Sequence, residues 1–183
     1  MMVRRRLVLA TVGGTLAFGA IPRKPHAKTL DALPDILEAV SPPVNPPDGV
    51  FVSQDGVSHR LAEFKGRGMV VNLWATWCAP CVAEMPSLDA LSKALAPYDI
   101  AVLPVSSDRG GADTVRAWYN AHNISALPVL LDPKGALAQA FGARGIPTTV
   151  IVGRSGKVVA RAEGAADWGA PAAQALIRTL TAS

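Results

Sequence analysis

Residues 70–81 read VVNLWATWCAPC and contain the only two cysteines of this 183-residue chain. The apolar run over residues 69–74 predicts a short strand that is buried on both faces. Residues 78–95 place apolar side chains at intervals of three and four, which is typical of a helix. Cys78 is therefore expected where a buried strand passes into a helix, with Cys81 one turn further along.

Structural roles explain this pair of cysteines poorly. A disulfide across two intervening residues closes a very short loop and restricts the unfolded chain little. A structural zinc site needs four ligands, and the three histidines, His26, His59 and His122, are scattered along the chain. Two unrelated buried thiols would share this spacing only by coincidence. The pattern favours a redox-active pair, and it predicts no bound metal.

The start of a helix favours an ionised sulfur at Cys78. Free backbone N–H groups and the positive end of the helix dipole face that position. Both stabilise the thiolate and lower the pKa of the thiol. Pro80 suits the first helical turn, where its missing N–H costs nothing. We therefore expect Cys78 to attack a substrate disulfide and the shielded Cys81 to resolve the mixed disulfide.

Strand and helix patterns alternate from Asp48 to the end of the chain. Such alternation indicates an α/β domain with a mixed sheet, and a turn sequence at residues 54–56 predicts an early hairpin. A short helical piece is expected over residues 30–40. The predicted strands are 51–52, 57–61, 69–74, 100–105, 129–131, 148–152 and 157–162, and the predicted helices are 78–95, 112–122, 135–141 and 168–180.

The motif WCAPC at residues 77–81, directly after such a strand, resembles the site of thioredoxin-fold oxidoreductases. The wider string over residues 72–86 resembles their exported TlpA/ResA/DsbE-like branch. The stretches GIPTT at residues 145–149 and EGAADW at residues 163–168 are similar to TlpA-like sequences. The resemblance implies a thioredoxin-like fold, with a central mixed β-sheet flanked by helices and an N-terminal hairpin extension.

The resemblance also implies further site residues. It implies that the peptide bond before Pro147 is cis, that Pro147 lies against the two sulfurs, and that the backbone of Ile146 pairs with an incoming peptide. Trp77 is expected to be exposed beside the thiolate and to form, with Ala79 and Pro80, the surface that binds protein substrates. The other three tryptophans are expected to pack in the interior.

The proton of the second thiol needs an acceptor. Thioredoxins proper carry a buried aspartate six residues before the first cysteine, whereas this chain has Asn72 there, which cannot titrate. Glu84 lies three residues after Cys81, on the same predicted helix face, and it matches a glutamate near the site of ResA-like proteins. We predict Glu84 as the proton shuttle. The alternative is an exposed glutamate without a role.

The N-terminus is typical of an exported protein. Arg4, Arg5 and Arg6 precede an apolar run of 15 residues, which is short for a membrane-spanning helix and within the range of a signal sequence. Residues 1–21 are predicted to be a signal peptide or a short membrane anchor. Residues 22–47 hold seven of the 15 prolines and are predicted to form an extended linker. Residues 48–183 are predicted to form the thioredoxin-like domain, placed in the periplasm.

The net charge of +4 does not indicate a nucleic-acid partner. Three of the 18 basic residues are the leader arginines, which leaves 15 Lys and Arg against 14 Asp and Glu in the rest of the chain. A protein that binds the phosphate backbone would need basic residues clustered on its folded domain.

The sequence thus predicts a periplasmic thiol:disulfide oxidoreductase that acts as a monomer, without a cofactor, and mainly as a reductant of disulfides in exported proteins. Ala79 and Pro80 bring no side-chain donor or cation to stabilise a thiolate, which favours the reducing end of the range for this fold. Such a reductant must draw electrons from a membrane thiol donor. TlpA-like relatives imply substrates in cytochrome c or cytochrome oxidase assembly.

Two other functions on the same fold stay open. A copper chaperone would use the two sulfurs and a histidine, and thiolates suit Cu(I), although related chaperones space their cysteines more widely. A thiol peroxidase of the peroxiredoxin type wants a proline and a threonine at fixed distances before the reactive cysteine. This chain has Val71 and Ala75 at those positions.

Overall fold

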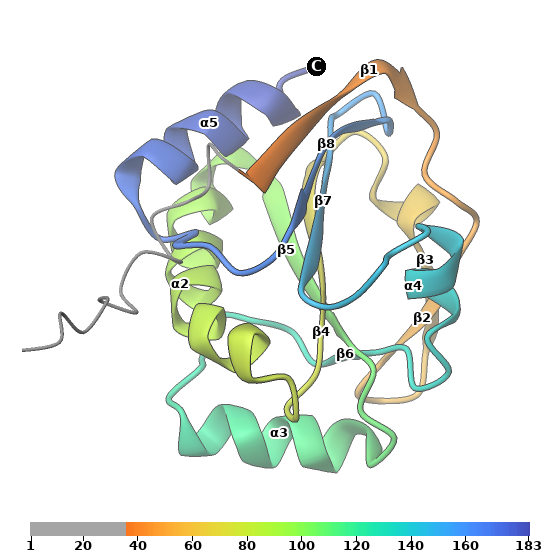
Figure 1. Ribbon diagram of the computed structural model, residues 1–183, viewed down its shortest axis with the longest axis vertical. Helices are drawn as coiled ribbons and strands as arrows, with labels where there is room; N and C mark the ends of the chain where they lie inside the picture. The colour runs from red at the N-terminus through yellow and green to blue at the C-terminus, as the bar shows by residue number, and fades with distance from the viewer. Residues whose placement is uncertain (1–35) are drawn as a thin grey trace, which may run out of the picture.

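The computed structural model describes residues 36–183, which build an eight-stranded mixed sheet in the order β1-β8-β7-β4-β5-β6-β2-β3 (Figure 1). At its centre, β4 (Gly68–Trp74) runs parallel to β5 (Ile100–Ser106) and antiparallel to β7 (Thr148–Val152). The mixed sheet predicted from the sequence is confirmed. The predicted signal sequence or anchor and most of the predicted linker lie outside the described residues.

All seven residues of β4 are buried, because the strand has a neighbour on each side and packed layers on both faces. Side chains alternate between the two faces of a strand. Met69, Val71 and Leu73 enter one core cluster, whereas Val70 and Trp74 enter the other. Asn72 shares the face of Val70 and Trp74, so a polar side chain stands in the middle of an otherwise apolar face.

Three helices contribute to the core on that face: α2 (Ala79–Leu95), α3 (Gly111–Ala121) and α5 (Pro171–Thr181). Figure 1 shows α2 and α5 beside each other and α3 across the end of the sheet where α2 begins. Trp74 stacks on Tyr119 of α3, with ring centroids 5.8 Å apart. A short 3₁₀ helix, η3 (Ala96–Tyr98), follows α2. Within residues 36–183, no helix is long and apolar enough to cross a bilayer.

The opposite face of the sheet is covered by shorter elements. The 3₁₀ helix η2 (Leu61–Phe64) and α4 (Ala136–Ala140) pack there, against a core cluster that includes residues of β2 (Val50–Ser53) and β6 (Leu130–Leu131). β3 (Ser58–Arg60) forms the edge of the sheet beside β2. β2 and β3 pair antiparallel, which confirms the predicted early hairpin. Its second strand is shorter than predicted, because the chain turns into η2 at Leu61.

The helix predicted over residues 30–40 is wrong from residue 37 onward. Residues Leu37–Val44 form β1, which pairs antiparallel with β8 (Val158–Glu163) and extends the sheet into the predicted linker. The pairing satisfies backbone groups of β8 that would otherwise be unpaired, and this tertiary contact outweighs local helix propensity. Pro42 and Pro43 fall in the irregular part of the pairing, where a missing donor is tolerated.

Gly68 begins β4 at a point where α5 crosses closely. A Cβ at this position would lie 2.6 Å from Thr181 Cβ, so we expect Gly68→Ala to lower the free energy of unfolding by about 1–3 kcal/mol through overpacking. Gly145→Ala is the matched control, since a Cβ there meets nothing within 4 Å. Urea unfolding of both variants measures the difference. Equal stabilities would contradict the close contact between α5 and β4.

Candidate active site

Cys78 lies between the end of β4 and the start of α2, as predicted. It is the N-cap of α2, with extended backbone angles (φ −92°, ψ 101°), and Pro80 occupies the first helical turn. Cys78 and Cys81 are joined in a disulfide with their Cα atoms 5.2 Å apart. The backbone N–H of Cys81 donates to Cys78 Sγ over 3.3 Å. The same N–H would stabilise a thiolate on Cys78 after reduction.

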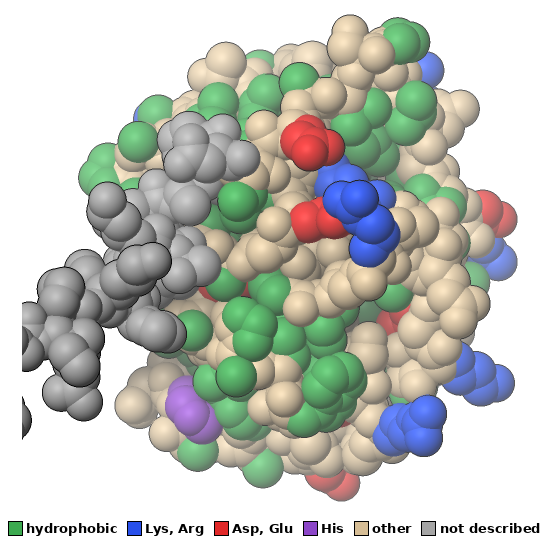
Figure 2. Space-filling model, viewed as in Figure 1, with side chains coloured by type: hydrophobic (Ala, Val, Ile, Leu, Met, Phe, Trp, Pro, Cys, Tyr) green, Lys and Arg blue, Asp and Glu red, His purple; other side chains and the backbone are tan. Residues whose placement is uncertain are grey.

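The two cysteines differ in their access to solvent. Cys81 is 0% exposed and Cys78 is 6% exposed, so Cys78 is the sulfur that a substrate can approach. Trp77 is 69% exposed, and Ala79 and Pro80 are exposed beside it. Hydrophobic side chains gather in Figure 2 over the part of the molecule where α2 begins near α3 in Figure 1. The exposed position predicted for Trp77 is therefore confirmed, as is the buried position of Trp74.

A loop before β7 faces the disulfide from the other side. The Ile146–Pro147 peptide bond is cis, as the resemblance implied. The carbonyl oxygen of Ile146 lies 3.6 Å from Cys78 Sγ. The carbonyl of Gly145 accepts from the Thr148 hydroxyl at 2.7 Å, which fixes the loop on β7. The structure therefore brings the Ile146 carbonyl to Cys78 Sγ, and Pro147 follows it in the same loop.

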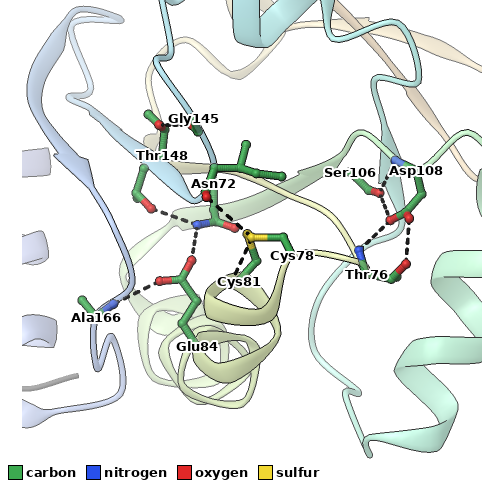
Figure 3. Close-up of a disulfide and its surroundings, with 12 residues drawn as sticks. Asn72, Thr76, Cys78, Cys81, Glu84, Ser106, Asp108, Gly145, Thr148 and Ala166 are labelled. Atoms are coloured by element: carbon green, nitrogen blue, oxygen red, sulfur yellow. Dashed lines mark hydrogen bonds between the residues drawn. A yellow bond between two sulfur atoms is a disulfide. The ribbon is translucent and has the colours of Figure 1, made fainter. Parts of the chain in front are cut away.

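Glu84 is fully buried, so the alternative of an exposed helix glutamate is excluded. From α2 its carboxylate reaches β4 and the segment between β8 and α5 (Figure 3). Glu84 Oε1 accepts from Asn72 Nδ2 at 2.8 Å. Glu84 Oε2 accepts from the Trp168 indole N–H at 2.9 Å and the Ala166 N–H at 3.1 Å. Every one of these donors is neutral.

Burial raises the pKa of Glu84 from 4.5 to about 7, since a charged carboxylate loses solvation there. The hydrogen bonds from Trp168, Asn72 and Ala166 oppose this rise, because they favour the ionised form. Oε2 already accepts two hydrogens and Oε1 accepts one. A proton taken up by Glu84 therefore binds most readily at Oε1, on the side of Asn72.

A second buried carboxylate lies on the other side of the disulfide (Figure 3). Asp108, just after β5, accepts from the Thr76 N–H at 2.9 Å and from the Thr76 hydroxyl at 2.7 Å. It also accepts from the Ser106 hydroxyl at 2.7 Å. Thr76 is two residues before Cys78, so this carboxylate fixes the loop that carries Trp77 and the reactive cysteine.

Among residues 36–183, no group of three or more His, Cys, Asp and Glu side chains is gathered closely enough to hold a metal ion. The ring of His122 stacks on Trp118 with centroids 3.9 Å apart, and His122 Nδ1 lies 2.8 Å from the Trp118 carbonyl oxygen. That histidine is engaged with its own helix.

Sequence reasoning missed two parts of the site. Trp168 was expected only to pack, yet it also donates to Glu84. Asp108 was not singled out, although a signal was available. It is an acid directly after a buried strand that neighbours β4, and the carboxyl ends of parallel strands meet at one edge of a sheet.

These features define a class of protein: a thioredoxin-like sheet with a dithiol pair at a helix N-terminus, opposite a cis-proline loop. The comparisons with known proteins agree. The chain belongs to the Redoxin family, whose model matches residues 39–177. It is a thiol:disulfide oxidoreductase with the predicted thioredoxin-like fold, and the predicted enzyme class is confirmed. Disulfide-containing proteins are its substrates.

Named relatives include the thiol-disulfide oxidoreductase ResA of Geobacillus thermodenitrificans (strain NG80-2), 28% identical over 158 residues, which cover 86% of this chain and 87% of that protein. The thioredoxin-like protein YneN of Bacillus subtilis (strain 168) is 33% identical over 114 residues, or 61% of this chain and 65% of YneN.

Solved structures give the same result. A thioredoxin-family thiol:disulfide interchange protein from Chlorobium tepidum TLS aligns with a TM-score of 0.61 at 26% identity, covering 78% of this chain and 99% of that one. The exposed lipoprotein thioredoxin Etrx1 of Streptococcus pneumoniae strain TIGR4 aligns with a TM-score of 0.57 at 31% identity, covering 73% of this chain and 97% of that one.

The raised pKa of Glu84 predicts a pH-dependent stability. The folded state binds the proton more tightly than the unfolded chain, so the free energy of unfolding falls as the pH rises from 4.5 to about 7. Glu84→Gln removes this titration. Relative to the native protein, we expect the variant to gain roughly 3 kcal/mol across that interval, as measured by urea unfolding at a series of pH values.

Glu63→Gln is the control of opposite sign. The pKa of Glu63 is lowered, chiefly by its hydrogen bond with His59, so this carboxylate stabilises the fold above its unfolded pKa. Removing it should cost stability as the pH rises to 4.5, and the loss should stay constant above that pH, where Glu84 titrates. A Glu84→Gln variant whose stability parallels that of the native protein at every pH would contradict the raised pKa.

Proposed function

We propose that this protein is a periplasmic reductant of disulfides in exported proteins, with Cys78 as the attacking sulfur and Cys81 as the resolving sulfur. The observation that carries the proposal is the position of Cys78 Sγ at the N-terminus of α2, where it accepts a hydrogen bond from the Cys81 N–H. Cys81 in turn lies about one helical turn before Glu84, a buried acid whose pKa is about 7.

The first step is attack on the substrate. The Cys78 thiolate attacks one sulfur of the substrate disulfide, the substrate S–S bond breaks, and the second substrate sulfur leaves as a thiolate. The mixed disulfide then contains Cys78. The carbonyl of Ile146, close to Cys78 Sγ and ahead of the cis bond to Pro147, is available to pair with the backbone of the bound peptide.

The second step needs a base. Cys81 is buried and must lose its proton before it can attack Cys78 Sγ. Glu84 is the proton acceptor, since it lies three residues along α2 and its pKa of about 7 is close to the pH at which it would work. The new Cys78–Cys81 bond forms, the substrate sulfur leaves as a thiolate, and that thiolate takes up a proton.

Substrate proteins bind over an apolar surface made of Trp77, Ala79 and Pro80. All three are exposed around the reactive sulfur, and a large exposed aromatic side chain marks a contact surface rather than a core. The surface bears no charge of its own, which suits substrates whose cysteines are flanked by apolar residues.

The direction of electron flow follows from the residues between the cysteines. Ala79 and Pro80 add no cation or side-chain donor to the thiolate, so the dithiol is a better reductant than a site with a histidine there.

The leader sequence over residues 1–21 supports export, with cleavage or retention as a membrane anchor. A membrane thiol donor supplies the electrons, the protein works as a monomer, and the similarity to TlpA- and ResA-like proteins points to cytochrome c or cytochrome oxidase assembly.

Trapping of the mixed disulfide tests this function. In Cys81→Ser the resolving sulfur is gone, so we expect substrate proteins to stay linked to Cys78 when the variant is expressed in its own cell envelope. Cys78→Ser is the matched control and should capture nothing. Non-reducing electrophoresis with mass spectrometry identifies the partners.

Recovery of cytochrome assembly factors would support the assigned pathway. Recovery of newly exported proteins awaiting oxidation would reverse the direction of electron flow. A reduced protein that binds Cu(I) stoichiometrically while failing to reduce any disulfide would instead support the copper-chaperone alternative.

A further inference from the structure

Asn72 carries a buried polar atom without a partner. The residue is 0% exposed at the middle of β4, on the face that α2 covers. Its Nδ2 donates to Glu84 Oε1 at 2.8 Å and to Thr149 Oγ1 at 2.9 Å. Its Oδ1 accepts no hydrogen bond within the described residues. Buried carbonyl oxygens are almost always paired in folded proteins, so this one needs an explanation.

The NH₂ group of the amide faces Glu84. An ionised carboxylate only accepts hydrogen bonds, so this orientation is the one that suits the charged form of Glu84. Turning Asn72 Oδ1 towards the ionised Glu84 would place two acceptors against each other. Figure 3 shows the side chain of Asn72 between Glu84 and the disulfide. The side chain that carries the unpaired oxygen is thus one of those that surround the two sulfurs.

In the oxidised protein, the two sulfurs offer no hydrogen-bond donor to Asn72 Oδ1. Neither sulfur carries a hydrogen while Cys78 and Cys81 are bonded to each other. Reduction supplies two hydrogens to the site. Cys78 Sγ, held by the Cys81 N–H at the helix start, is the sulfur that ionises, whereas Cys81 is fully buried and keeps its proton.

We propose that in the reduced protein the Cys81 thiol donates its hydrogen to Asn72 Oδ1, which makes Asn72 a positioning residue for the resolving step. The inference rests on the proposed function for the role of Glu84. Asn72 then contacts both partners of the proton transfer. Its oxygen orients the S–H group of Cys81, and its NH₂ group orients Glu84 Oε1, the carboxylate oxygen that accepts one hydrogen bond rather than two.

After Cys78 has formed the mixed disulfide, the Cys81 proton passes from sulfur to Glu84 Oε1, and the electron pair left on sulfur forms the Cys81–Cys78 bond. The Cys78–substrate bond breaks, and its electron pair leaves on the substrate sulfur, which takes up a proton. Two electrons move from the dithiol to the substrate. The Cys81 proton is left on Glu84, which returns it to solvent, and the two substrate sulfurs take their protons from solvent, so that Asn72 itself is unchanged.

The hydrogen bond can be observed directly, because this chain has only two cysteines. Cys78→Ala leaves the Cys81 thiol as the single S–H group. We expect its infrared stretching band at the lowered frequency of a strongly bonded thiol, and at the frequency of an unbonded thiol once Asn72→Leu is added. Thr149→Val is the matched control: it removes the other partner of the amide, leaves Oδ1 in place, and should leave the band lowered. A band that Asn72→Leu does not move overturns the proposal.

A second measurement needs no substitution at Asn72. In the native protein, the side-chain carbonyl carbon of Asn72 should shift downfield by NMR when the disulfide is reduced, because a hydrogen then arrives at Oδ1. An unchanged chemical shift overturns the proposal, even if Asn72→Leu does not fold.

Kinetics separate this inference from the role of Glu84. A small aromatic disulfide serves as the substrate and forms a mixed disulfide with Cys78. Asn72→Leu should slow the resolution of that mixed disulfide about 10-fold and leave the initial attack by Cys78 unchanged. Glu84→Gln should remove the inflection near pH 7 from the rate of resolution, while the S–H band of the Cys78→Ala/Glu84→Gln protein stays lowered. A retained inflection would count against Glu84 as the shuttle, and the band would still decide the role of Asn72.

Discussion

The contact between the Cys81 N–H and Cys78 Sγ is the interaction on which the site depends. It exists because Cys78 is the N-cap of α2, and that position is set by the strand before it. β4 is buried along its whole length between β5 and β7, so its end cannot shift without breaking two ladders of hydrogen bonds. The helix dipole and the free N–H groups are thereby aimed at one sulfur.

Two buried carboxylates flank this junction, and they do different work. Asp108 is tied to Thr76 and Ser106, which immobilises the loop entering the helix. Glu84 is tied to groups on two other segments, through Asn72 of β4 and through Ala166 and Trp168 between β8 and α5. One acid therefore fixes the geometry of the attacking sulfur, and the other stands on the side of the resolving sulfur, where a proton must be moved.

The sequence predicted what depends on local pattern. The alternation of strands and helices, the helix start at Cys78 and the exposure of Trp77 all follow from short stretches of the chain, and the structure confirms them. β1 was missed because a helical pattern of residues was overridden by the open edge of β8, far along the chain. The contact of Trp168 with Glu84 was missed for the same reason, since 84 residues separate the two.

The amide at position 72 explains why one glutamate suffices. An aspartate there would place a second carboxylate oxygen where Asn72 Nδ2 now lies, 2.8 Å from Glu84 Oε1. Two acids at that distance cannot both ionise in a buried site, so they would share a proton and titrate as a pair with widely separated pKa values. The amide leaves a single titrating carboxyl group, whose pKa burial raises to about 7. An amide neither gains nor loses a proton in this range. In the proposed resolving step, the proton released by Cys81 therefore has one acceptor, and that acceptor can release it again at nearly the same pH.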